Sequence, residues 1–145
     1  MASLLSTHTR YFEPDNAQDI PGIIVQITRG VDTYIIWAGT TTQAISGGDE
    51  AQKSLAVQSG RLGVDWACSM PSPKPSMPVA GTTLLRTSQD PVALPLSQRL
   101  AQRFKKQMFV SIDISASQKI GGKGPMVALA VEKAVIVSLK ALENP

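Results

Sequence analysis

Residues 96–114, LSQRLAQRFKKQMFVSIDI, change from a helical to a strand-like pattern with no glycine or proline between the two halves. The first half has apolar residues at intervals of four, which predicts a helix with one buried face. These residues are Leu96, Leu100 and Phe104. We expect the helix to end at Gln107. The second half alternates and predicts a strand, with Phe109 as an exception to the alternation. Its buried face is expected to contain Met108, Val110, Ile112 and Ile114.

The helical half of this stretch carries four positive charges and no negative one. Cations in the last turn of a helix interact favourably with its dipole, by about 0.3 to 1 kcal/mol each, which gives Arg103, Lys105 and Lys106 a structural reason to be there. Arg99 lies one turn earlier and forms an exposed stripe with Arg103 and Lys106, which the dipole does not explain. We therefore predict a partner-binding surface that faces an acidic protein. Its residues are Arg99, Arg103, Lys105 and Lys106.

The overall composition indicates one globular domain over residues 1–145. Hydrophobic residues make up 43% of the chain and charged residues 17%, which excludes wholesale disorder. No apolar run approaches the roughly 20 residues that cross a bilayer, so we expect no membrane partner. The first residues lack the cationic start of a secretory signal, and Cys68 is the only cysteine. We expect the protein in the cytoplasm, with the nucleus as a further location.

The N-terminal third of the chain predicts strands. Residues 22–28 and 33–38 are rich in β-branched and aromatic side chains and are separated by a glycine- and aspartate-containing turn, so they predict a β-hairpin. Residues 7–13 predict an edge strand that ends before Pro14, because proline lacks the N–H that a sheet requires. Residues 40–52 are rich in Thr, Ser, Gly and acidic residues and predict a solvated loop.

The middle of the chain predicts two strands around a proline-rich loop. Residues 54–69 are interpreted as one long strand that bends or bulges near Gly60 and Gly63. Residues 69–81 contain four of the ten prolines and predict an extended irregular loop. Residues 82–87 are then expected to return to the sheet.

The C-terminal segment has two interpretations. Valine and leucine alternate with alanine over residues 126–131, which predicts a strand antiparallel to 108–114, followed by a helix. The alternative is one helix over the whole of 126–142, and we favour the strand. Together, the predicted elements form an α+β fold of about six antiparallel strands, in a sheet or sandwich-like arrangement, with two main helices packed on it. The predicted order along the chain is β-β-β-β-β-α-β-β-α.

No combination of residues predicts catalysis, a metal or a cofactor. His8 is the only histidine, so a zinc site would have to combine it with Cys68 and carboxylates that have no useful spacing. Cys68 and His8 could also form a nucleophilic pair. We favour the other interpretation, in which Cys68 is a buried thiol and His8 is an exposed histidine. The GGKG at 121–124 lacks the Ser or Thr that follows lysine in a phosphate-binding loop and predicts a hairpin loop. Aromatic residues are only 5% and follow apolar patterns, so no nucleic-acid partner is expected.

The stretch 96–114 resembles a hallmark of the proteasome assembly chaperone 4 family, in which a Leu-x-Gln-Arg-Leu helix leads into a Lys-Gln-x-Phe-Val-Ser strand. The matching positions are Leu96, Gln98, Arg99, Leu100, Lys106, Gln107, Phe109, Val110 and Ser111. YIIWAGTT at 34–41 and SLAVQS at 54–59 are also similar. The loops 41–53 and 69–81 look longer than in the shorter members, and the GGKG loop is an addition.

The resemblance implies a non-enzymatic chaperone that forms a heterodimer with a sibling chaperone of the same fold, proteasome assembly chaperone 3. The pair would bind alpha-type subunits while the alpha ring of the proteasome core particle forms, and would dissociate as beta subunits arrive. An alternative is a small α+β adaptor module of another complex, of the trafficking or profilin-like type. A third is an enzyme that uses Cys68.

Overall fold

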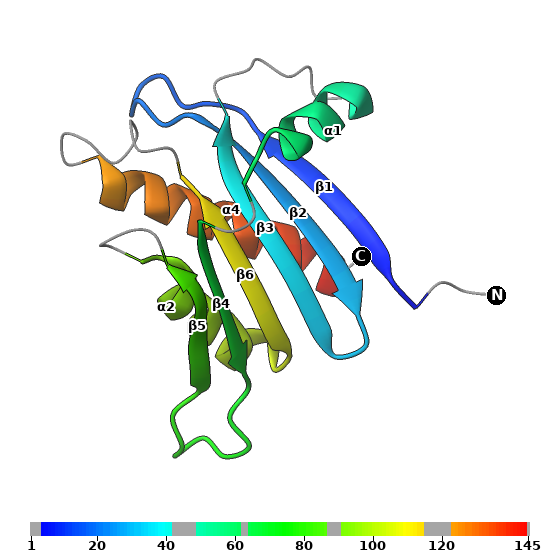
Figure 1. Cartoon of the computed structure of the whole chain (residues 1–145), viewed down its shortest axis with the longest axis vertical. Coiled ribbons are helices and arrows are strands. Elements are labelled where there is room, and N and C mark those ends of the chain that lie inside the picture. The colour runs from blue at the N-terminus through cyan, green and yellow to red at the C-terminus, as the bar shows by residue number, and fades with distance from the viewer. Residues whose placement is uncertain (1–3, 42–48, 62–63, 87–90, 115–122, 145) are drawn as a thin grey trace. The chain divides into compact units, whose positions relative to one another are not determined.

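The computed structural model describes residues 4–41, 49–61, 64–86, 91–114 and 123–144. Six strands form one sheet in the order β1-β2-β3-β6-β4-β5 (Figure 1). The strands are β1 (Ser6–Phe12), β2 (Gly22–Gly30), β3 (Thr33–Thr41), β4 (Asp65–Met70), β5 (Ala80–Arg86) and β6 (Gln107–Asp113). The helices are α1 (Glu50–Gln58), α2 (Ala93–Phe104) and α4 (Gly124–Glu143). None of these helices combines the length and apolar character that a membrane span needs.

The chain forms two compact units, and each contains part of the sheet. The first unit consists of residues 1–8, 27–37 and 62–112, and therefore contains β4, β5, β6 and α2. The second unit consists of residues 9–26, 38–61 and 113–145, and contains α1 and α4. Within the second unit, α4 lies behind the strands in Figure 1 and α1 lies in front of them.

The predicted α+β class is confirmed, and most of the predicted strands are present. β1, the β2–β3 hairpin, β5 and β6 lie where the sequence pattern indicates them, and residues 71–79 are irregular as the prolines suggest. The hairpin turn contains Asp32 with φ 52°, a left-handed conformation that aspartate tolerates better than most residues.

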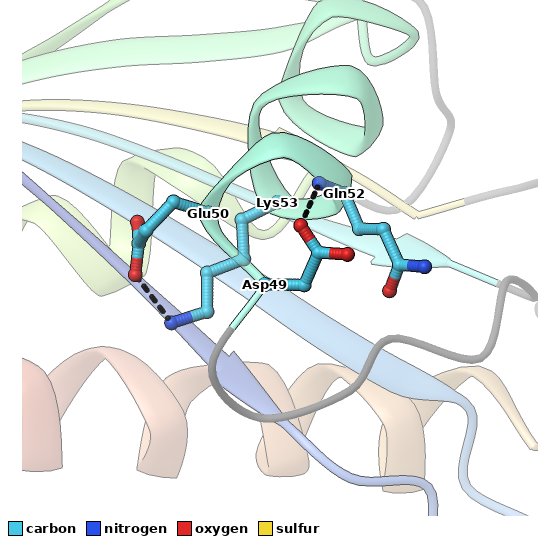
Figure 2. A network of polar contacts seen from close by, with 4 residues as sticks. All are labelled: Asp49, Glu50, Gln52 and Lys53. Carbon is cyan, nitrogen blue, oxygen red and sulfur yellow. Dashed lines mark hydrogen bonds and ion pairs between the residues drawn. The ribbon is translucent and has the colours of Figure 1, made fainter.

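The prediction of one long strand over 54–69 is wrong, because residues 50–58 form α1 and β4 begins only at Asp65. The Oδ1 atom of Asp49 accepts a hydrogen bond from the Gln52 N–H at 3.1 Å, which caps the helix (Figure 2). Glu50 and Lys53 form an ion pair at 3.1 Å one turn apart. These local contacts stabilise a helix in a segment where the loop and strand patterns are weak. The predicted loop lies largely at 42–48, outside the described residues.

The strand predicted over 126–131 is also wrong, and the alternative of one helix is correct. α4 places its buried residues at helical spacing, and Pro125 occupies its first turn. These buried residues are Val127, Val131, Ala134, Val135, Ser138 and Leu139. The described chain therefore has three helices rather than two. The GGKG segment is not a simple hairpin loop either, since Gly124 begins α4, and residues 121–122 lie outside the description.

α2 is shorter than the sequence predicts, because the helix ends at Phe104 and not at Gln107, and residues 105–106 connect it to β6. Lys105 has φ 58° and ψ 38°, and its N–H donates to the carbonyl of Ala101 at 3.0 Å. This left-handed residue reverses the chain at the end of the helix. The Gln107 N–H then donates to the Asp32 carbonyl at 3.0 Å, so β6 and β3 begin at the same end of the sheet and are parallel. β4 is antiparallel to both β5 and β6.

Small side chains allow α2 to lie close to β4 and β5. The buried face of α2 contains Ala93, Leu96, Ser97, Leu100 and Ala101. The hydroxyls of Ser97 and Ser69 are 2.6 Å apart, and Ser97 also donates to the Leu94 carbonyl at 2.8 Å. A Cβ atom at Gly81 would lie 2.5 Å from the Ser69 hydroxyl and 3.0 Å from Leu94 Cδ1. A glycine at position 81 therefore leaves room for α2 to pack at this distance from β5.

A carboxylate from β4 caps the N-terminus of α2. Val92 occupies the N-cap position, where its side chain accepts no hydrogen bond. The Oδ2 atom of Asp65 instead accepts from the N–H groups of Val92 at 2.7 Å and Ala93 at 3.0 Å. Asp65 is 3% exposed, so these backbone donors have little access to water. The cap therefore connects the first turn of α2 to the strand beneath it.

We expect the replacement Asp65→Ala to lower the free energy of unfolding by about 2 to 3 kcal/mol, because it leaves buried N–H groups without an acceptor. The control is Asp49→Ala, which removes the exposed cap of α1 and should cost about 0.5 to 1 kcal/mol. Urea denaturation of both variants measures the difference. Equal losses would show that the Asp65 cap has no special role in docking α2.

Candidate protein-binding site

The predicted basic residues lie on and just after the part of α2 that faces away from β4 and β5. Leu96 and Leu100 are 0% and 1% exposed and form the buried side of the helix, as predicted. Arg99, Arg103 and Lys105 are exposed, whereas Lys106 is half-buried. The structure thus brings the arginines together on one exposed flank and gives the two lysines different surroundings.

Phe104 is not a core residue as the four-residue spacing suggests. Its side chain is half-buried, and the Arg103 guanidinium carbon lies 5.9 Å from the centroid of its ring. The helix ends at this residue, so the ring lies at the rim of the helix–sheet contact. A guanidinium at this distance from a half-buried ring has a weak cation–π interaction, and Arg103 stays exposed.

The two lysines have structural roles in the turn between α2 and β6. Lys106 Nζ lies 5.0 Å from the centroid of the Tyr34 ring, and Tyr34 is fully buried. The lysine therefore covers an edge of the core through a cation–π contact. Lys105 has the left-handed backbone conformation that ends the helix. Of the four predicted residues, Arg99 and Arg103 are the ones best placed for a partner, and we call them the arginine flank.

A surface hollow of about 370 Å³ lies beside the arginine flank. It is lined by Pro78, Val79, Pro95, Gln98, Arg99 and Gln102. The amide of Gln98 donates to the Val79 carbonyl at 3.3 Å, which joins α2 to the residues just before β5. The hollow therefore places Arg99 next to the start of β5.

The other side of β4 forms a second candidate surface, which the sequence analysis missed. Asp65 and Ser69 point towards α2, so the alternating Trp66, Cys68 and Met70 point to the opposite side of the sheet. The register extends this side across both neighbouring strands. The pairs are Trp66 with Ser111 and Leu85, Cys68 with Phe109 and Thr82, and Met70 with Ala80.

Apolar side chains dominate this side of the sheet in the first unit. Met70 is 54% exposed, Ile35 of β3 is 47% exposed and Leu85 is 43% exposed. Trp66, Cys68 and Phe109 are half-buried. We call these six residues, Ile35, Trp66, Cys68, Met70, Leu85 and Phe109, the apolar sheet face. The signal in the sequence was Phe109, the apolar residue where the alternation of β6 calls for a polar one.

The residues considered for catalysis or metal binding are not brought together. Cys68 Sγ accepts a hydrogen bond from the Gln107 amide at 3.6 Å, and His8 Nε2 lies 3.1 Å from the Ser6 hydroxyl. His8 is on β1, and β2, β3 and β6 lie between β1 and β4 in the sheet. With strands about 4.8 Å apart, the two side chains are much too far apart for a proton transfer. Within the described ranges, no group of three His, Cys, Asp or Glu could bind a metal ion.

The architecture matches a chain of known structure. It is similar to a chain in the crystal structure of a novel chaperone complex for yeast 20S proteasome assembly, with a TM-score of 0.61 and 18% sequence identity. The match covers 96% of this chain and 98% of that chain. At this identity the comparison establishes the fold. No curated protein matches the chain in sequence.

The sequence identifies the family directly. The family model described as proteasome assembly chaperone 4 matches residues 22–114. The chain belongs to the proteasome assembly chaperone 4 family, as the resemblance of the helix–strand stretch predicted. The matched range runs from the start of β2 to just beyond β6 and so includes the arginine flank and the apolar sheet face. The family is one of proteasome assembly chaperones.

The left-handed conformation of Lys105 can be tested separately from its charge. Non-glycine residues pay about 1 to 2 kcal/mol in this conformation, and β-branched residues suffer most. We expect Lys105→Gly to be at least 1 kcal/mol or so more stable than Lys105→Val. Chemical denaturation of the two variants measures the difference, and both variants lose the same charge. Equal stabilities would contradict a structural role for this residue.

Proposed function

We propose that this chain is a non-enzymatic chaperone that forms a heterodimer with a sibling chaperone of the same fold, of the proteasome assembly chaperone 3 type. The pair binds alpha-type subunits, promotes formation of the alpha ring of the proteasome core particle, and then dissociates. The observation that carries the proposal is the apolar sheet face, which offers exposed apolar side chains to another protein.

The chemistry of the apolar sheet face favours a partner with a matching sheet. Exposed apolar side chains gathered on one surface are a common mark of an interface, and aromatic residues and methionine are enriched in such surfaces. Two sheets can pack face to face about 10 Å apart with their side chains interdigitated. A sibling of the same fold would present an equivalent face. Pairing would then remove Ile35, Met70 and Leu85 from water and make a sandwich of the two sheets.

The arginine flank supports a second, independent contact. α2 packs on the side of β4 that contains Asp65 and Ser69, whereas the apolar sheet face contains Trp66, Cys68 and Met70 on the other side. A sibling bound on one side would leave the arginines accessible to an alpha-type subunit. Positive charge on this flank favours an acidic surface of the subunit and increases the rate of encounter.

A chaperone of this kind acts by mass action. Binding to one arrangement of subunits in preference to others shifts the population towards that arrangement by no more than the difference in binding free energy. No covalent step or cofactor is needed for this work. We propose that it takes place in the cytoplasm and also in the nucleus, with no nucleic-acid or membrane partner.

Native mass spectrometry of the tagged chain, purified from its own cell, tests the pairing. The expected complex contains one further chain of nearly equal size, alone or with alpha-type subunits. Replacing Ile35 by lysine should weaken pairing by at least about tenfold, because a charge enters the apolar sheet face. The control is Leu129→Lys on α4, since Leu129 is 51% exposed and Ile35 is 47% exposed.

Two results would contradict this assignment. Equal pairing of Ile35→Lys and Leu129→Lys would remove the apolar sheet face from the interface. Recovery of the chain with partners unrelated to the proteasome would favour an adaptor function instead. Because Cys68 is the only cysteine, its rate of alkylation provides an independent measurement, which should fall when the sibling is bound.

The arginine flank is tested by charge reversal. Replacing Arg99 and Arg103 by glutamate should slow association of the heterodimer with alpha-type subunits and reduce the dependence of the association rate on salt. Pairing with the sibling should be unchanged, because the flank lies on the other side of β4. Stopped-flow association at several salt concentrations makes the measurement. An unchanged rate would remove the arginines from the proposed contact.

A further inference from the structure

The outer edge of β5 is open in the described part of the chain. β5 is the last strand in the sheet order, and its pairing with β4 occupies one of its two backbone edges. All residues of β5 are exposed. An unpaired strand edge presents a row of N–H and C=O groups that can accept a further strand.

The two faces of β5 have different surroundings. Gly81 and Thr83 pair with Ser69 and Ala67, so they point towards α2, and a Cβ at Gly81 would lie 3.0 Å from Gln98 Cγ. Thr82 and Leu85 pair with residues of the apolar sheet face and point to the opposite side. Side chains of a strand added beside β5 would therefore alternate between the α2 side and the side of the apolar sheet face.

The α2 side of this edge has a strong excess of positive charge. Among the described residues of 64–112, the only carboxylate is that of Asp65, which is buried under α2. The exposed cations of the same range include Arg86 at the end of β5 and the arginine flank. Arg99 also lines the hollow formed with Pro78 and Val79, immediately before β5 begins. An acidic side chain would meet favourable charge here, and a basic one would be repelled.

We propose that the free edge of β5 binds an extended segment of a partner protein in which acidic residues alternate with apolar residues. The acidic side chains lie over the arginine flank, and the apolar side chains continue the apolar sheet face beyond the edge of β5. Main-chain hydrogen bonds supply affinity, and the alternation of the segment supplies specificity. The inference rests on the proposed function and deepens it, because it names the chemistry of the partner segment held beside the arginines.

A bulge in β5 limits the length of the pairing. Trp66 pairs with Leu85 and Ala67 pairs with Thr83, so Leu84 is an extra residue in β5. Such an extra residue interrupts the regular ladder and increases the local twist. The segment therefore pairs with residues 80–83, next to the hollow and Arg99.

The test uses the full-length chain and a capped synthetic peptide of about eight residues with alternating glutamate and valine. The peptide should slow hydrogen exchange and shift the NMR amide signals at residues 80–83 more than elsewhere in the sheet. Its affinity, measured in the same titration, should fall as salt is raised. A peptide with lysine in place of every glutamate should bind at least about tenfold more weakly.

Two matched controls separate strand addition from simple charge attraction. In an added strand only every second N–H group of the peptide faces the sheet. N-methylation of the groups that face the sheet should abolish binding, whereas N-methylation of the groups that face away should preserve it. Arg99→Glu/Arg103→Glu should weaken binding by about tenfold or more, whereas Lys133→Glu/Lys140→Glu on α4, an equal change of charge, should not.

Three results would overturn the inference. The two methylated peptides could lose affinity equally, or the two double variants could bind the peptide equally. The third result is that the peptide slows hydrogen exchange away from β5 and not at residues 80–83. Pairing with the sibling chaperone is measured separately by native mass spectrometry. Normal pairing without peptide binding would remove only this inference, whereas peptide binding without pairing would remove the proposed role of the apolar sheet face.

Discussion

The arrangement of the first unit depends on the docking of α2 on β4. The Asp65 carboxylate accepts two N–H groups at the start of the helix, and the Ser69 and Ser97 hydroxyls meet in the middle of the contact. These buried polar contacts fix both the position of the helix along the strand and its rotation. The rotation in turn decides which residues of α2 face solvent. The exposure of Arg99 and Arg103 is thus a consequence of contacts on the opposite side of the helix.

The same docking places the two proposed binding surfaces on opposite sides of a single sheet. Because side chains of β4 alternate, the strand contributes Asp65 and Ser69 to one side and Trp66 and Cys68 to the other. A chaperone that must contact a sibling and a client at the same time needs such a separation. A sheet with one helix-covered side and one apolar side supplies it without a second domain.

The sequence predicts the helix–strand stretch because each half has a strong and different period. The segments 50–58 and 126–131 were misassigned since short runs of alanine, valine and leucine fit both periods. The Asp49 cap favours the helix in the first segment, and the buried residues of α4 lie at helical spacing in the second. The Asp65 cap could not be predicted, because it joins residues far apart in the sequence. Phe109 was visible as an irregularity in the alternation of β6. That it belongs to the apolar sheet face follows only from the register of β6 with β4, which pairs it with Cys68. The assignment of the basic residues to a partner surface stays a prediction, and the separate role of Lys105 depends on a backbone conformation that lysine seldom adopts.

The extra residue Leu84 has a consequence for the chain before it finds any partner. A long, flat, uninterrupted edge would allow copies of the chain to join edge to edge and grow into insoluble fibres. An irregularity four residues into β5 prevents such growth while a short stretch stays accessible. The bulge thus keeps the accessible stretch of β5 too short to serve as a template for such a fibre.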